Sequence, residues 1–403
     1  MTRPHLSTPP STLAEVVVDL GAVRHNVARL RDLMATGLAE GQEPPALMVV
    51  VKADGYGHGM VQVARAARGA GAEWLGVATG EEALALRASG DTGPLLCWLA
   101  GPGTDFGPLL SADVEVAAYS VRQLEEIVVA ARSVGGPARV QLKFDTGLAR
   151  GGAARDEWGP LVAAARSAEE SGEVVVTGLW SHLACADEPE HPVNAAQHAA
   201  FEEACALASE AGLTQALRHL ANSAGAVLTP GVRHDLVRLG IAVYGFSPAP
   251  EIVSGETLGL VPAMTVRGRV VLTRQLAAGD GVSYGHTYIA EQSQQVALVP
   301  LGYADGVPRH ASSRAEVSIG GSREQILGRV CMDQFVVSAA NARPGDEVVL
   351  FGPGTQGEPT AQEWASWCGT ISYEIVTRMG GRPARVWVGE ADDEASYGEG
   401  EGR

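Results

Sequence analysis

Lysine occurs only twice in this chain of 403 residues, at Lys52 and Lys143, although lysine and arginine together number 30. An amine can lose its proton, attack a carbonyl or carry a carbamate, whereas a guanidinium stays protonated and does none of these readily. Both lysines close apolar runs that lead into turns rich in Gly and Asp, at 49–59 and 140–147. The two positions therefore predict chemistry that needs an amine; chance survival on edge strands is the alternative.

Other polar residues close or follow further apolar runs of the chain. They are His182, Asn222, Ser223 and Arg238, and Gly240 and Ile241 come directly after Arg238. Taken singly, His182 would be a structural histidine, Arg238 a buried ion-pair partner, and the Asn-Ser pair a helix cap. Taken together with a lysine at a strand end and backbone amides that can bind phosphate, they suggest pyridoxal phosphate as a cofactor.

The elements that would position these residues alternate between strand and helix patterns. Eight strand-like runs occur in the first part of the chain, at 47–51, 74–78, 95–99, 114–118, 140–144, 174–180, 217–220 and 236–242. Amphipathic stretches such as 121–131 and 195–211 lie between them. Eight βα units predict an α/β fold, a (β/α)8 TIM-type barrel, with a doubly wound open sheet as the alternative. In such a barrel all the residues named above would face one rim.

The pattern changes after about residue 258. Short β-branched runs separated by turns follow, at 264–272, 295–301, 316–319, 324–330, 334–337 and 347–351. With one helix near 361–367, they predict a smaller, mostly β C-terminal domain. The expected organisation is a tail over 1–13, a barrel over 14–257, a β domain over 258–389 and an acidic, disordered tail over 390–403. A strand over 14–20 could pair with the β domain.

Composition excludes several classes of function. A net charge of −17 argues against nucleic acid or an anionic membrane as a partner. The sequence shows no apolar run long enough to span a bilayer, and residues 1–10 have no signal-peptide core. The five cysteines show neither disulfide nor metal-ligand spacing, which favours a reducing cytoplasm. We expect no metal in the active site.

Several motifs occur in the order found in alanine racemases, which are fold-type III pyridoxal-phosphate enzymes. They are VKADGYGHG at 51–59, LKFDTGLAR at 142–150, WSHLA at 180–184, ANS at 221–223, VRLGIAVYG at 237–245, VSYG at 282–285, GYADG at 302–306, GRVCMD at 328–333 and TISYE at 370–374. The chain resembles this family from about residue 15 to residue 388. Asp54 and Gly55, where Asn-Ala is common, and Gly151 and Gly152 depart from the pattern without touching the chemistry.

The resemblance implies a role for each matching residue. Lys52 would bond to pyridoxal phosphate and act as one catalytic base, and Tyr284 would act as the other. The cofactor's phosphate would be bound by Tyr56, Asn222, Ser223, Gly240, Ile241 and Tyr373, its pyridine nitrogen by Arg238 and its phenolic oxygen by Arg150. His182 would hydrogen-bond to Tyr284, and Lys143 would carry a carbamate beside Arg150. Met332 and Tyr303 would lie near the substrate carboxylate, with Arg309 and Asp333 supporting the site.

The implied activity is interconversion of L- and D-alanine, which supplies D-alanine for peptidoglycan in a bacterium. Because the lysine and the tyrosine lie in different domains, the resemblance also implies a homodimer with shared active sites. A related decarboxylase or a racemase of broader specificity is an alternative within the same class. A non-catalytic carrier of the cofactor is the alternative outside it, although such proteins resemble the barrel alone.

Overall fold

The computed structural model describes residues 13–38, 41 and 43–389. Contacts divide the described chain into two compact units, one formed by His25–Val261 and the other by the residues up to Arg24 together with those from Pro262 onward. The predicted tails lie outside the described residues, apart from Leu13. In the part of the chain that the structure covers, no helix combines the length and the apolar character of a membrane span.

The first unit is built on an eight-stranded parallel sheet with the order β8-β7-β6-β5-β4-β3-β2-β9. All eight predicted strands are confirmed; they are β2 (Ala46–Val50), β3 (Trp74–Val77), β4 (Leu95–Cys97), β5 (Glu115–Ala118), β6 (Ala138–Lys143), β7 (Val174–Trp180), β8 (Leu217–His219) and β9 (Leu236–Leu239). Two backbone hydrogen bonds, from Asp235 to Arg218 and from Arg238 to Ala221, both 3.0 Å, join the first and last strands of that order. The sheet is therefore a nearly closed barrel, as the sequence predicts.

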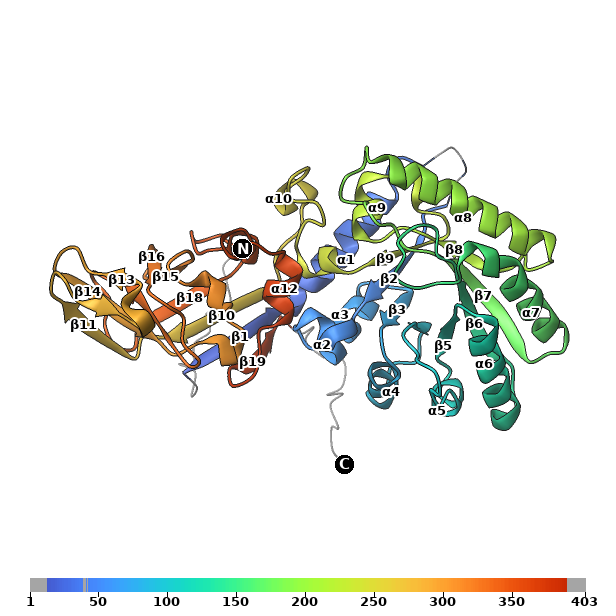
Figure 1. Cartoon of the computed structure of the whole chain (residues 1–403), viewed down its shortest axis with the longest axis horizontal. Helices are drawn as coiled ribbons and strands as arrows, with labels where there is room; N and C mark the ends of the chain where they lie inside the picture. The colour runs from blue at the N-terminus through green and yellow to red at the C-terminus, as the bar shows by residue number, and fades with distance from the viewer. Residues whose placement is uncertain (1–12, 39–40, 42, 390–403) are drawn as a thin grey trace, which may run out of the picture. The chain divides into compact units, whose positions relative to one another are not determined.

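Helices follow most of the strands and lie on the outside of the barrel (Figure 1). They are α3 (Met60–Gly69), α4 (Gly80–Ala88), α5 (Gly107–Ser111), α6 (Val121–Val134), α7 (Trp158–Glu170), α8 (Pro192–Glu210) and α9 (Ser223–Leu228). Helix α1 (Leu20–Met34) precedes the first barrel strand, and the short α10 (Gly255–Leu258) follows the last. The segment labelled α2 (Lys52–Tyr56) is a left-handed turn after β2. Helix α6 shows why the helices form. Ser120 caps its first turn, Leu124, Ile127, Val128 and Ala131 bury one face, and Gly135 ends it in the left-handed conformation.

Apolar side chains fill part of the barrel interior. Met48, Trp74, Leu96 and Leu236 form a buried cluster contributed by four different strands. Polar side chains fill another part, since Glu115, Gln141 and His219 are also buried. Buried polar groups are stable only where they are hydrogen-bonded, so this part of the core must be a connected network.

The second unit contains a nine-stranded sheet with the order β11-β14-β17-β16-β15-β18-β10-β1-β19. Its strands are β1 (Ala14–Asp19), β10 (Met264–Arg269), β11 (Leu272–Leu276), β14 (Gln294–Val299), β15 (Glu316–Ile319), β16 (Ser322–Leu327), β17 (Phe335–Ser338), β18 (Glu347–Phe351) and β19 (Ala384–Val388), and a separate ribbon pairs β12 (Gly281–Val282) with β13 (Tyr288–Ile289). The unit is mostly β, as predicted. Its helices are α11 (Ala361–Cys368), where one was expected, and α12 (Ser372–Thr377).

Strand β1 shows how the amino-terminal segment joins this sheet. It pairs antiparallel with β10 and parallel with β19, so the expected pairing of the strand over 14–20 with the β domain is confirmed. The run predicted over 264–272 is two strands instead of one, because the chain leaves the ladder after Arg269 and starts β11 at Leu272. The sheet's separate small core contains Leu276, Val282, Ala290, Val296 and Leu327.

Candidate active site

Lys52 lies directly after β2, at the carboxyl end of the barrel strands. The turn that follows is left-handed, with φ of 52° at Ala53, 53° at Asp54 and 62° at Gly55. The Asp54 carboxylate accepts a hydrogen bond of 2.9 Å from the Met60 amide, which holds the turn against the start of α3. Asp-Gly suits this backbone better than bulkier residues would.

Burial lowers the pKa of Lys52, and the positive charge of Arg150 lowers it further. The negative charge of Glu82 acts in the opposite direction but does not cancel these effects. The Nζ atom lies 5.9 Å from the centre of the Trp98 ring. A larger share of this amine is therefore unprotonated near neutral pH than for a lysine in water, which is the form that attacks carbonyls and takes up protons.

Lys143 ends β6 and lies over Trp180, with its Nζ atom 4.6 Å from the ring centre. Burial lowers its pKa to about 8, helped by the charges of Arg238 and Arg150. Both lysines of the chain thus sit at the same end of the barrel strands with depressed pKa values. The prediction that these positions need an amine is consistent with that placement.

Arg238 is buried in β9, with 4% of its surface exposed. Its two terminal nitrogens donate to the carbonyl oxygens of Ser181, Leu220 and His219, at 2.7, 3.0 and 2.9 Å. They also face the Nδ1 atoms of His219 at 3.0 Å and His182 at 3.3 Å. Among the described residues no acceptor takes the Nε–H of Arg238, so this donor is available to a ligand.

A chain of buried polar side chains supports Arg238 from inside the barrel. Because a guanidinium only donates, His219 accepts at Nδ1 and must carry its proton at Nε2, which then donates to Gln141 Oε1 at 2.8 Å. Gln141 in turn donates to Glu115 at 2.8 Å. Glu115 also accepts from Thr177 and Arg139. These residues were not predicted from the sequence, although a polar residue inside an apolar strand, as at Glu115 and Gln141, is a signal that could have found them.

His182 sits where the positive charges of this rim converge. Burial lowers its pKa well below the usual 6.5, and the charges of Arg238, Arg150, Lys143 and Lys52 lower it further. It is therefore a neutral imidazole near pH 7. A chain with net charge −17 has gathered four cationic side chains here, which makes the rim a site for an anionic ligand.

Ser223, Gly240 and Tyr56 are brought together at the adjoining part of the rim. The Gly240 amide donates to Ser223 Oγ at 2.9 Å, and Asn222 caps α9 by accepting from the Gly225 amide at 3.0 Å. A side chain at Gly240 would place its Cβ 2.4 Å from the Tyr56 hydroxyl, so only glycine fits. Burial raises the pKa of Tyr56 to about 12, which keeps this hydroxyl a hydrogen-bond donor. Ile241 begins the next turn and is buried.

The predicted site residues of the other unit cluster among themselves. Backbone hydrogen bonds from Tyr303 to Cys331 and from Ala304 to Met332, at 3.1 and 3.0 Å, hold two loops together. Ser283, next to Tyr284, donates to the Arg329 carbonyl at 2.7 Å. Large parts of the side chains of this group are exposed: 71% of Tyr284, 53% of Met332 and 40% of Tyr303.

Arg382, which the sequence analysis did not single out, braces these loops. It donates to both carboxylate oxygens of buried Asp305 at 2.8 Å and to Asp333 at 2.6 Å. The two other predicted residues of this unit are Arg309, in the short turn Arg309–Ala311, and Tyr373, in α12. Nothing in the sequence around Arg382 gives a local signal, since its two partners lie far away in the chain.

The barrel, its rim lysine and the mostly β second unit define a class, the fold-type III pyridoxal-phosphate enzymes. Residues 18–248 match the family described as "Alanine racemase, N-terminal domain", and residues 263–387 match "Alanine racemase, C-terminal domain". The chain belongs to the alanine racemase family, whose members depend on pyridoxal phosphate.

Curated relatives and solved structures agree with this assignment. The alanine racemase of Salinispora arenicola is 52% identical over 380 residues, which cover 94% of this chain and 99% of that protein. The crystal structure of alanine racemase from D-cycloserine-producing Streptomyces lavendulae has a TM-score of 0.91 at 48% identity, covering 95% and 98% of the two chains. The structure of the Streptomyces coelicolor A3(2) enzyme has a TM-score of 0.90 at 50% identity, covering 94% and 98%.

Proposed function

We propose that this chain interconverts L- and D-alanine with pyridoxal phosphate, and that in a bacterial cytoplasm it supplies D-alanine for peptidoglycan. The observation that carries the proposal is the position of Lys52, a partly buried amine with a lowered pKa at a cationic rim of the barrel. Relatives about half identical over nearly the whole chain, all named alanine racemase, support the substrate. Five free cysteines support a reducing compartment.

The residues of the rim fit the cofactor. Lys52 would bond to it covalently. The phosphate would be bound by the neutral Tyr56 hydroxyl, by Ser223 and by the amides at Gly240 and Ile241, at the place where Gly240 leaves no room for a Cβ. The remaining positions proposed here for binding are Asn222 and Tyr373 beside the phosphate and Arg150 at the phenolic oxygen. When bound, pyridoxal phosphate supplies an electron sink for the charge left on the substrate's α-carbon.

We assign the two proton transfers to Lys52 and Tyr284. Racemisation removes a proton from one face of the α-carbon and returns one to the other, so it needs a base on each face. Lys52 can accept a proton because its pKa is lowered. Tyr284 would be oriented by neutral His182: because His182 Nδ1 accepts from Arg238, its Nε2 carries the proton and would donate to the Tyr284 oxygen, which favours the phenolate.

Substrate binding is assigned to groups of both units. Arg150 would pair with the substrate carboxylate, and Met332 and Tyr303 would close around it. Arg309 and Asp333 would hold the surrounding loops, and the Asp333–Arg382 ion pair of 2.6 Å supports that role. The exposure of Tyr284, Tyr303 and Met332 within their own unit supports a homodimer in which a partner chain covers them.

The Arg238→Glu substitution is expected to raise transamination relative to racemisation by about tenfold or more, which corresponds to about 1.4 kcal/mol. A guanidinium only donates, so Arg238 would hold the pyridine nitrogen of the bound cofactor unprotonated and keep the electron sink weak. A carboxyl group could instead protonate the nitrogen and strengthen the sink. Pyruvate released per D-alanine formed is the measurement. An unchanged ratio contradicts the assignment.

Lys143 is proposed to carry a carbamate that pairs with Arg150. A bare ammonium there would repel Arg150, whereas a carbamate offers it two acceptors. The lowered pKa, about 8, supports the proposal because only the neutral amine takes up carbon dioxide. In bicarbonate buffer, native mass spectrometry should detect one added carboxyl group of about 44 Da per chain in wild type and none in Lys143→Arg. Equal masses for both, after correction for the substitution, contradict it.

Incubation of the purified enzyme with L-alanine in D2O tests the proposed function. The expected result is D-alanine carrying deuterium at the α-carbon and convergence on equal amounts of the two enantiomers. Deuterium entering L-alanine without inversion would show that only one base works. No exchange at all would favour a different substrate or a cofactor-binding role.

A further inference from the structure

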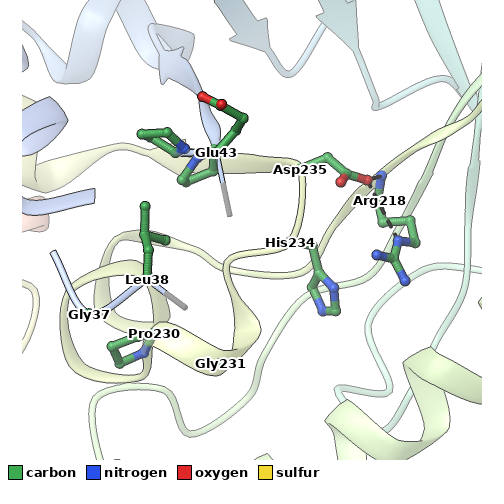
Figure 2. A pocket seen from close by; sticks show the side chains of 10 residues that line it. Gly37, Leu38, Glu43, Arg218, Pro230, Gly231, His234 and Asp235 are labelled. Atoms are coloured by element: carbon green, nitrogen blue, oxygen red, sulfur yellow. Dashed lines mark hydrogen bonds and ion pairs between the residues drawn. The ribbon is translucent and has the colours of Figure 1, made fainter. Parts of the chain in front are cut away.

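A second cluster of reactive side chains lies on the outside of the barrel, away from the rim that carries Lys52. His198 and Glu202 occupy successive turns of α8 and therefore share one face of that helix. His234 belongs to the segment immediately before β9, whereas Lys52 follows the carboxyl end of β2. Figure 2 shows His234 close to the neighbouring pair Asp235 and Arg218. These three residues, with Pro230 and Glu43, are among those that line a cavity of about 630 Å³.

The spacing within this cluster suits a metal ion. Glu202 Oε1 lies 3.5 Å from His198 Nε2 and 3.6 Å from His234 Nδ1. The three ligand atoms all lie within 4.8 Å of one another. Tetrahedral zinc with ligand bonds of about 2.1 Å places its ligand atoms about 3.4 Å apart, so small side-chain rotations would complete the site.

His234 is held in one orientation with little contact with solvent. Only 7% of its side chain is exposed; its Nε2 is buried without a hydrogen-bond partner among the described residues, and its Nδ1 faces Glu202. Its backbone is left-handed, with φ of 50°. The ring is fixed edge-on against Phe201 at 5.2 Å and His198 at 5.3 Å. The packing therefore fixes the ring with Nδ1 directed toward Glu202, the position from which it could share an ion with that carboxylate.

Arg218 orients the carboxylate of this cluster. Its terminal nitrogen lies 3.8 Å from Glu202 Oε2, the oxygen that does not face the histidines, and its Nε lies 3.6 Å from Asp235. Second-layer contacts of this kind fix the direction in which a ligand presents its free oxygen. The Asp235 carboxylate also offsets part of the guanidinium charge that would repel a cation.

We propose that His198, Glu202 and His234 bind one divalent transition-metal ion of the zinc type. Two imidazoles and one carboxylate are a ligand set that Zn²⁺ accepts, and water would fill the remaining position. The ion would tie α8 to the segment that leads into β9. This is the seam where two backbone hydrogen bonds join β9 to the β8 side of the barrel, so the metal would brace barrel closure and take no part in racemisation.

Equilibrium dialysis of the untagged holoenzyme against Zn²⁺, followed by metal quantification, tests the site. The expected result is one zinc per chain and a rise in Tm of about 5 °C at a hundredfold excess over Kd. Glu202→Gln and His234→Asn should lose both effects. Asn suits the left-handed backbone at 234, so the second variant removes the ligand without straining the fold.

Glu203→Gln is the matched control, because it makes the same charge change one residue away, on a side chain that pairs with Arg155 instead. It should bind zinc and respond in Tm as wild type does. Racemase turnover, or the cofactor's absorbance if turnover is absent, reports that each variant is folded. Failure of wild type to retain zinc, or equal retention by the 202 and 203 variants, overturns the proposal whatever the catalytic function is.

Discussion

Lys52→Arg is expected to lower kcat/KM for alanine racemisation by at least about a thousandfold, within the range that a positioned proton-transfer group supplies. The substitution keeps the positive charge and roughly the length of the side chain. It removes the ability to lose a proton and to bond covalently to a carbonyl carbon, because a guanidinium stays protonated. The loss would therefore report on amine chemistry and not on the electrostatics of the rim. The measurement is the initial rate with each enantiomer at saturating cofactor.

Borohydride reduction of the holoenzyme adds a second measurement that does not depend on turnover. Because the chain has two lysines, the reduced cofactor can be attached to either of two side-chain amines. We expect peptide mapping to place it on Lys52 in wild type and in Lys143→Arg, and to find none in Lys52→Arg. Trapping on Lys143 instead would reverse the roles given to the two lysines.

The barrel was predictable from the sequence because its signals are local. Each barrel strand is a short apolar run, and helix ends such as Gly135 follow from turn chemistry that needs only neighbouring residues. The two lysines, Arg238 and the Ser223–Gly240 pair stood out for the same reason, as polar groups at the ends of apolar runs. The structure places them at one end of the barrel strands, as the fold requires.

What the sequence did not reveal depends on partners far apart in the chain. Strand β19 was missed because its half-buried residues have no strong alternation, and it exists by pairing with β1 from the opposite end of the chain. The role of Arg382 could not be predicted because it depends on hydrogen bonds to Asp305 and Asp333, which are distant in the sequence. Gln141 and His219 are polar residues in apolar strands, and their presence is explained only by the hydrogen bonds that link Arg238 to His219 and His219 to Gln141. Side-chain networks of this kind have no periodicity to detect.

Tyr284→Phe is expected to lower the racemisation rate by about a hundred- to ten-thousandfold, the range for loss of a positioned base. With 71% of the side chain exposed in its own unit, removal of one hydroxyl should leave the stability of the isolated chain almost unchanged. In D2O, one enantiomer should still exchange its α-hydrogen through Lys52 without inverting, while the other should not exchange. Wild-type exchange of both enantiomers by the variant would remove Tyr284 from the mechanism.

Combining the two inactive variants tests whether an active site takes its lysine from one chain and its tyrosine from another. In a mixed dimer of Lys52→Arg with Tyr284→Phe, a shared arrangement puts both defects into one site and leaves the other site intact. Random pairing would then restore about a quarter of wild-type activity, since half of the dimers are mixed and each has one working site. If every site were built from a single chain, each would keep one defect and the mixture would stay as inactive as its parents. The cofactor's absorbance in each parent is the control that both variants fold. With that control met, and since each parent alone is inactive, recovered activity has no source other than a tyrosine supplied across the interface.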